Sequence, residues 1–287
     1  MSKLIPFHIF TLWLVPLTAQ ISADFSEGSA APFDIIINEI MEDATIDGGG
    51  TLGLPALEYV ELCNRSDKTI NLENFEFSDG GTKAAVFPSY ELAPDTYLLI
   101  GKKSAEALME YGDFLGLANF PTLSSEETLT LKNEFGDLID VVSYTQDWYG
   151  GTSTAGGGYS LERINPQSPC EGMTNWQGSS SFLGGTPGSQ NAVFNLSIAA
   201  TRLNIIDAYP ISDTAIRISF NKKISEAVLT DLDNYSITNH LIESIYLVEN
   251  SLQAVILNLQ NPLSTNVIET VTVADDFSDC LDNPIDG

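Results

Sequence analysis

Acidic side chains gather between residues 39 and 61, where they could work in pairs or supply a set of oxygen ligands. Two carboxylates that flank one sugar can catalyse glycoside hydrolysis. Several carboxylate oxygens can instead bind a hard cation such as calcium. The glycine-rich stretch 42–56 is typical of a loop, so its acids are the calcium candidates here. The carboxylates of the whole stretch are Glu39, Glu42, Asp43, Asp47, Glu58 and Glu61.

A second acidic run lies near the end of the chain and contains Asp275, Asp276 and Asp279. These three residues are further calcium candidates. Their spacing does not fit an EF-hand loop, which needs glycine at its sixth position and glutamate at its twelfth. A solvated turn is the alternative interpretation of this run.

Two aromatic residues, Trp148 and Tyr149, open the glycine-rich stretch 147–158. Exposed aromatic rings on a β-sandwich can stack on the apolar faces of sugar rings. Trp148 and Tyr149 are therefore the candidate ligand-binding residues.

Other kinds of catalytic and binding site have little support in the residues. Outside the first residues His240 is the only histidine, and it falls in a predicted turn without the partners of a catalytic triad. No CxxC pair accompanies it, which excludes a zinc site of cysteine and histidine. The glycines 156–158 lack the following helix and lysine of a phosphate loop. We predict no catalytic residue and no cofactor, with calcium as the one metal considered.

The charge of the chain limits its partners. Of 287 residues, 39 are acidic and 12 basic, which gives a net charge of −27, and no basic cluster is larger than Lys102-Lys103 or Lys222-Lys223. Nucleic acid attracts basic surfaces, so it is excluded as a partner. The partner itself stays unknown, and a cell-surface polysaccharide or protein is the candidate class. The acidity suits solubility outside the cell.

The first 23 residues have the pattern of a secretory signal peptide. Lys3 precedes an apolar run over residues 9–17, and small residues follow at 18–23. Cleavage after Ala19, Gln20 or Ala23 fits equally well. No later apolar run reaches membrane length, so we predict an exported mature chain without a transmembrane segment, located outside the cell, at its surface or in the periplasm.

Three cysteines remain after such a cleavage: Cys63, Cys170 and Cys280. Two of them could pair in an oxidising compartment, but their spacing leaves the pairing open.

Short apolar and alternating runs separated by turn residues fill the rest of the chain. They predict an all-β protein with two sandwich domains in tandem, a tether over residues 24–33 and a linker over 192–202. A bulge is expected at Asn74, where the alternation changes phase, and a serine-capped helix is expected over 104–111. Residues 165–191 are expected to be an irregular lid. The strands predicted in the first domain are 34–41, 57–63, 69–77, 84–87, 96–101, 127–132, 138–144 and 159–164, and those in the second are 203–208, 215–220, 235–237, 244–248, 254–259 and 268–273.

Short motifs in fixed order give residues 33–191 a family resemblance. They are INEIM (37–41), GLP (53–55), EYVEL (58–62), SDG (78–80), LAPDTYLLIG (92–101), SLERI (160–164), NW (175–176) and GTPGSQN (185–191). This pattern resembles a lamin-tail domain of the secreted bacterial kind, whose fold is an immunoglobulin-like β-sandwich. The resemblance implies structural roles for Glu39 and Glu61, and it implies that Trp176 fills the core beneath the last loop.

Residues 208–237 and 279–284 resemble an S-layer-type bacterial immunoglobulin-like repeat, although Asp282 replaces the usual small glycine. Related bacterial proteins often carry cysteine near positions 170 and 280, which implies a Cys170–Cys280 disulfide and a reduced Cys63. The chain ends where another module would begin, as in a fragment of a longer modular protein or a short relative.

Together these features predict an exported, non-catalytic surface or extracellular protein that binds or acts as a scaffold. It consists of a lamin-tail-like domain over 34–191 and an immunoglobulin-like domain over 203–287, with truncation at the end of the latter left open. One alternative is a polysaccharide-binding accessory module of a larger extracellular hydrolase or nuclease. A further alternative is a calcium-dependent hydrolase that uses the acids of the stretch 38–61.

Overall fold

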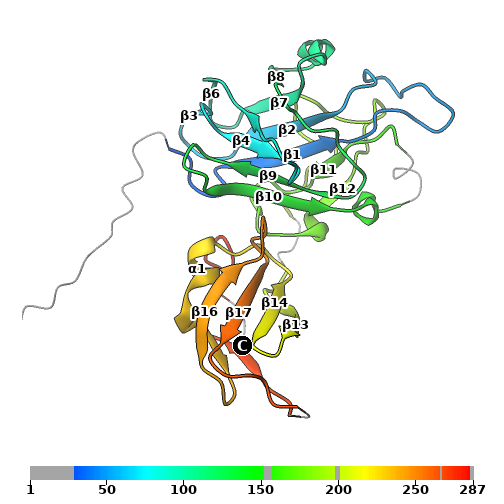
Figure 1. Cartoon of the computed structure of the whole chain (residues 1–287). Coiled ribbons are helices and arrows are strands. Elements are labelled where there is room, and N and C mark those ends of the chain that lie inside the picture. Colours follow the sequence, from blue (N-terminus) through cyan, green and yellow to red (C-terminus); the bar gives the residue numbers. More distant parts are fainter. Residues whose placement is uncertain (1–28, 152–156, 198–200, 266, 285–287) are drawn as a thin grey trace, which may run out of the picture.

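Two β-sandwiches follow one another along the chain (Figure 1). The computed structural model describes residues 29–151, 157–197, 201–265 and 267–284. The predicted signal peptide lies outside the described residues. Among the residues described, strands dominate both halves and the one α-helix has five residues, so the all-β prediction is confirmed. Within the described ranges, no helix has the length and hydropathy of a membrane span.

The first sandwich contains a six-stranded sheet in the order β12-β11-β1-β2-β7-β8, in which only the β7–β8 pair is parallel. Its strands are β1 (Ile35–Met41), β2 (Tyr59–Asn64), β7 (Tyr97–Lys102), β8 (Phe114–Leu117), β11 (Leu161–Arg163) and β12 (Trp176–Gly178).

A four-stranded sheet in the order β10-β9-β4-β5 packs against it. The strands are β4 (Glu76–Ser78), β5 (Ala85–Val86), β9 (Glu127–Lys132) and β10 (Leu138–Tyr144). A two-stranded pair completes the sandwich, β3 (Ile70–Asn71) and β6 (Glu91–Leu92), together with three 3₁₀ turns, η1 (Glu106–Glu110), η2 (Gln146–Tyr149) and η3 (Met173–Asn175).

The central strand β1 is buried along its whole length. Ile35, Ile37 and Ile40 face the core between the sheets, and a register shift between Ile37 and Glu39 accounts for the break in strict alternation. The other face of the strand carries the polar residues described below. Burial on both faces explains why this run is so rich in isoleucine.

Four local predictions for the first domain were wrong. Asn74 does not form a bulge: it has a φ of +64° in a turn that separates β3 from β4, and these strands lie in different sheets. The short helix expected over 104–111 is present as the 3₁₀ helix η1, but its serine cap was wrong, because η1 follows Ala105 and has no side-chain cap. Residues 165–191 are not wholly irregular, because β12 pairs with β11 there. The described end of the predicted tether packs on the domain, since Ala30 and Phe33 are buried.

The second sandwich has a four-stranded sheet in the order β13-β14-β17-β16 and a pair β15-β18. Its core contains Phe220, Leu257 and Phe277, and the helix α1 adds Leu229. Its elements are β13 (Ile205–Ser212), β14 (Ala215–Phe220), α1 (Glu226–Thr230), η4 (Leu232–Asn234), β15 (Tyr235–Ile237), β16 (Ile242–Leu247), β17 (Ala254–Leu259) and β18 (Val271–Val273).

Candidate functional site

Three fully buried carboxylates lie side by side on the outer face of the six-stranded sheet: Glu61 on β2, Glu39 on β1 and Glu162 on β11. Glu39 is the register partner of both Glu61 and Glu162. Register partners on neighbouring strands point to the same face, so the three residues form one row, called here the carboxylate row.

Backbone and hydroxyl donors from residues 184–193 cover the carboxylate row. Thr186 donates its N–H to Glu39 Oε1 over 2.9 Å and its hydroxyl to Glu162 Oε1 over 2.9 Å. The N–H of Gly188 donates to Glu61 Oε2 over 2.6 Å. The segment therefore covers the carboxylates, and the carboxylates accept its hydrogen bonds. The predicted lid is a fixed part of the folded domain.

Glycine is required in this segment because the backbone passes so close to the row. A Cβ on Gly185 would lie 2.7 Å from both Glu39 Oε1 and the hydroxyl of Tyr59. That hydroxyl itself donates to Glu39 over 2.7 Å. Gly188 has a φ of +74° and would place a Cβ 2.3 Å from the carbonyl oxygen of Tyr111.

Burial changes the protonation of the row. Burial raises the pKa of Glu39 from 4.5 to about 7, and the charge of Glu162 adds to this shift. The pKa of Glu61 is raised well above its usual value by burial and then by Glu39. Burial also raises the pKa of Glu162. Interacting carboxyls titrate in steps that belong to the set and not to a single residue, and burial favours the protonated form of each member of the row.

Chemically, the carboxylate row is suited to holding its covering segment. A glycosidase needs carboxylates that meet a substrate, whereas these three are fully buried and accept hydrogen bonds from the protein itself. The arrangement agrees with the structural roles that the resemblance implied for Glu39 and Glu61.

The calcium candidates of the first domain lie apart from this row. Glu42 is half-buried, and burial raises its pKa with help from the charge of Asp43. Asp43 accepts hydrogen bonds from the N–H and hydroxyl of Thr45, and Asp47 is exposed. Glu58 forms an ion pair with Lys102 at 2.7 Å.

In the second domain Asp275 and Asp276 are exposed, whereas Asp279 is buried in an ion pair. Asp279 was therefore wrongly grouped with open cation ligands, because a lysine already neutralises it. In the part of the chain that the structure describes, no three His, Cys, Asp or Glu side chains come close enough to hold a metal ion.

The aromatic candidates do not present open faces for a sugar. Tyr149 is only 3% exposed and belongs to the core, and Trp148 is half-buried against the same core. The ring of Trp148 lies 6.1 Å from that of Trp176, which is also buried, as the resemblance implied. The prediction of exposed rings was wrong because the apolar rings cover the end of the core instead of facing water.

His240 makes a contact that has no relation to a catalytic triad. Its Nε2 lies 3.2 Å from Glu269 Oε1. The imidazole is nearly buried beside that carboxylate, so it acts as part of the second domain's packing.

A covalent and electrostatic junction connects the two domains. Cys170 of the first domain and Cys280 of the second are joined by a disulfide, with their Cα atoms 5.5 Å apart. Cys63 is a buried free thiol. Burial raises its pKa to about 12, and the charge of Glu61 contributes.

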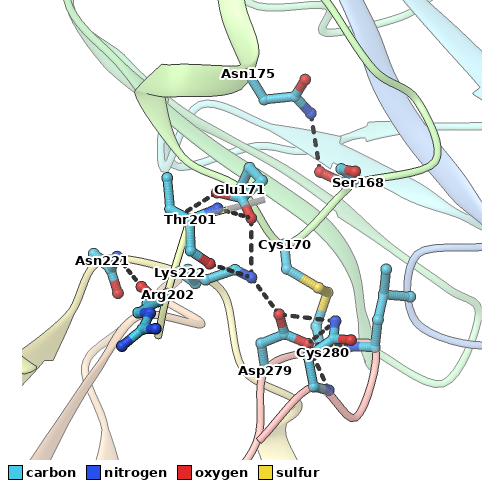
Figure 2. A network of polar contacts seen from close by, with 12 residues as sticks. Ser168, Cys170, Glu171, Asn175, Thr201, Arg202, Asn221, Lys222, Asp279 and Cys280 are labelled. Atoms are coloured by element: carbon cyan, nitrogen blue, oxygen red, sulfur yellow. Dashed lines mark hydrogen bonds and ion pairs between the residues drawn. A yellow bond between two sulfur atoms is a disulfide. The ribbon is translucent and has the colours of Figure 1, made fainter. Parts of the chain in front are cut away.

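Lys222 forms the centre of this junction (Figure 2). Its Nζ lies 2.9 Å from Glu171 Oε1 in the first domain and 2.5 Å from Asp279 Oδ2 in the second. Thr201 adds two hydrogen bonds to Glu171. Burial opposes the charge on Lys222, but the bonds to Asp279 and Glu171 outweigh it and raise the pKa of the lysine.

The next residue, Lys223, reaches into the first domain. Its Nζ lies 2.5 Å from Asp140 Oδ1, while Arg163 Nη2 lies 2.9 Å from Asp140 Oδ2. All three side chains are buried. Burial lowers the pKa of Lys223 to about 8, and Arg163 adds to this effect while Asp140 opposes it. The guanidinium of Arg163 also lies 4.6 Å from the ring centre of Trp176.

Backbone hydrogen bonds tie the same segments together. The N–H of Lys223 donates to the carbonyl of Cys170 over 2.7 Å, and the N–H of Cys280 donates to the carbonyl of Lys223 over 3.0 Å. Apolar contacts continue the junction, where Leu252 joins a cluster with Phe33 and Val141. The two sandwiches are therefore in direct, multiply bonded contact.

The sequence reasoning missed the importance of the two lysines. It noted Lys222-Lys223 only as a small basic cluster. One signal was available: Asp140 is a charge in the middle of the apolar run 138–144, and a charge predicted to be buried requires a partner. Nothing in the sequence identifies that partner as a residue 83 positions away.

A comparison with protein families identifies part of the first domain. Residues 28–146 match the family described as Lamin Tail Domain. The lamin-tail region thus spans β1 to β10, and the family fold is immunoglobulin-like. No curated protein matches the chain.

The matched range ends before the site is complete. Glu39 and Glu61 lie inside the lamin-tail region, whereas Glu162 and the covering segment 184–193 follow it. Strand β11 nevertheless pairs directly with β1, so the residues after 146 extend the lamin-tail sheet. The resemblance of residues 208–237 to an S-layer-type repeat stays a prediction.

Proposed function

We propose that this protein is an exported, non-catalytic binding and scaffold protein, in which a lamin-tail-like sandwich and an immunoglobulin-like sandwich are held in one fixed arrangement. The observation that carries the proposal is the junction. A disulfide and two buried lysine ion-pair groups connect the domains.

Binding modules that act independently do not require such a junction between them. Domains of one chain move relative to each other by default, unless their interface is large and hydrophobic. Here a disulfide and buried ion pairs add bonds that oppose such motion. Separation of the domains would break the buried ion pair between Lys223 and Asp140, and the loss of a buried charge partner is costly. A fixed spacing between two surfaces is what a scaffold or spacer requires.

The disulfide also supports the proposed export of the protein from the cytosol. Disulfides persist in oxidising compartments outside the cytosol, which agrees with the signal-peptide pattern of residues 1–23. The high acidity agrees with a solubilising surface outside the cell.

Solution scattering tests the fixed arrangement. We expect the profile of the purified, oxidised chain to fit one arrangement of its two domains. The double variant Cys170→Ser/Cys280→Ser combined with Asp140→Asn should broaden that distribution. A wild-type profile that requires a wide range of inter-domain distances would contradict the scaffold role.

Export and the absence of catalysis need their own tests. Expression with the native leader should yield a secreted chain whose mass shows removal of 19, 20 or 23 residues. Turnover of an ester, a glycoside or a nucleic acid that disappears in Glu39→Gln would overturn the non-catalytic assignment.

A further inference from the structure

The outer face of the four-stranded sheet in the second domain carries one aligned residue from each strand. The register partners are Tyr209 with Arg217, Arg217 with Ile256, and Ile256 with Tyr246. Partners across antiparallel strands share a face. The four side chains therefore form one row across the sheet, with a tyrosine at each end.

Both tyrosines are open to solvent. Tyr209 is 44% exposed and Tyr246 is 57% exposed. Three strand spacings separate them, which corresponds to about 14 Å. In the second domain Phe277 fills the core and the remaining tyrosine, Tyr235, is buried. Exposed rings therefore gather on this one face.

A shallow polar hollow of about 630 Å³ adjoins Tyr246 on the same face. Asn258 and Ser244 are register partners in its floor, two residues along from the tyrosine row, and Asn258 donates to Ser244 over 3.2 Å. Its lining offers hydroxyl, amide and carboxylate groups: Thr214, Glu243, Ser244, Tyr246, Asn258, Leu259 and Gln260.

The opposite face of the sheet packs on the core of the second domain, whereas the tyrosine face is exposed to solvent. Ile216, Ile218, Val255 and Leu257 point into the core, and α1 packs there through Leu229. The sheet buries its apolar side chains on that side. The exposed tyrosines on the other side lie outside this core and are available for contact with a ligand.

The chemistry of the face matches an uncharged polysaccharide. Aromatic faces pack on the apolar faces of sugar rings, while hydroxyl and amide groups exchange hydrogen bonds with sugar hydroxyls. The net charge of −27 repels polyanions. Arg217 is the one cation of the row: it lies 3.9 Å from Asp207, donates to Ser219 over 2.7 Å, and contacts Tyr209, whose ring centre is 5.9 Å from the guanidinium.

We infer that the row Tyr209–Arg217–Ile256–Tyr246 and the adjoining hollow are a binding face for a neutral polysaccharide chain. The chain runs across the strands, stacks on both tyrosines and enters the hollow beside Tyr246. This inference deepens the proposed function and rests on it, since it names the ligand class of an exported binding protein.

The experiment measures binding of the full oxidised chain to cellulose, chitin, mannan and starch, with alginate as an acidic comparison. We expect binding to at least one neutral polysaccharide and none to alginate. Tyr209→Ala and Tyr246→Ala should each weaken binding about tenfold, while Tyr246→Phe, which keeps the ring, should lose much less. Phe182→Ala is the matched control, because Phe182 is an exposed aromatic residue of the first domain.

Two results would overturn the inference: no binding to any of the four neutral polysaccharides, or binding that survives in the double variant Tyr209→Ala/Tyr246→Ala. Unchanged melting temperatures of the tyrosine variants would show that a loss of binding is not a loss of fold. The scattering test of the junction is independent, so the scaffold role and the binding face can fail separately.

Discussion

Lys223 Nζ lies 2.5 Å from Asp140 Oδ1, and this ion pair joins a residue of the second sandwich to a central position of the first. Arg163 holds the other oxygen of Asp140 at 2.9 Å. The aspartate therefore compensates two buried cations that come from different domains. This relationship makes the stability of the first domain depend on the presence of the second.

Removal of Asp140 tests that dependence. Asp140→Ala leaves Lys223 and Arg163 buried without their counter-charge, so the free energy of unfolding should fall by about 3–5 kcal/mol. Chemical denaturation of the whole chain measures the loss. The exposed Lys103 supplies a control for charge alone, and Lys103→Met should change stability by less than about 0.5 kcal/mol. An Asp140→Ala loss as small as the control's would mean that the pair does not stabilise the junction.

The carboxylate row predicts a dependence of stability on pH. The pKa of Glu39 rises from 4.5 to about 7 on folding, so the folded state binds this proton more tightly than the unfolded state. The corresponding stability is fully present below pH 4.5 and is lost as the pH rises through about 7. Its size is on the order of 3 kcal/mol.

Glu39→Gln should flatten this dependence, because glutamine remains neutral and can still accept from Thr186 and Tyr59. Denaturation of the wild type and the variant across that pH range measures the difference. Glu73→Gln, at an exposed site, should leave the wild-type profile unchanged. Parallel profiles for wild type and Glu39→Gln would show that Glu39 does not carry a proton in the folded state.

Gly185 should tolerate no side chain. In Gly185→Ala the new Cβ meets Glu39 and the hydroxyl of Tyr59 at 2.7 Å, and overpacking of this kind costs about 1–3 kcal/mol. Thermal unfolding of the variant should show the loss. Gly151→Ala is the matched control, since a Cβ there meets nothing within 4 Å. Equal melting temperatures for the two variants would indicate that segment 184–193 can move off the row.

The disulfide should contribute substantially to stability because it closes a long loop. Cys170 and Cys280 are 110 residues apart, and a loop of about that length corresponds to about 4–5 kcal/mol. Cys170→Ala/Cys280→Ala should lower the free energy of unfolding by up to this amount. A reduction of less than 1 kcal/mol would show that the ion pairs alone hold the junction.

Thiol labelling tests which of the three cysteines carries the free thiol. The native, oxidised chain should take up no iodoacetamide near neutral pH, because the thiol of Cys63 is buried and its pKa is raised to about 12. The unfolded, oxidised chain should take up one label, at Cys63. Peptide mapping that finds Cys63 in a disulfide would contradict the pairing.

Much of the fold was predictable from local patterns. The hairpin of residues 127–144 was predicted with the bounds that β9 and β10 have, because an alternating run, a turn at Gly136 and a second run specify a hairpin locally. Strands β14, β15 and β17 were equally clear. Strands β6 and β8 were not predicted, and β3 was merged with β4 in one strand over 69–77, because their pairing depends on distant partners.

The sequence by itself determined the all-β class, the acidic character and the set of residues able to carry charge. Only the tertiary structure decided which of them meet. Register aligned Glu39, Glu61 and Glu162 in one buried row, and it aligned Tyr209 with Tyr246 on an open one. The docking of the second sandwich placed Lys223 on Asp140. Strand pairing and domain docking join residues far apart in the chain, and local patterns carry no information about such partners.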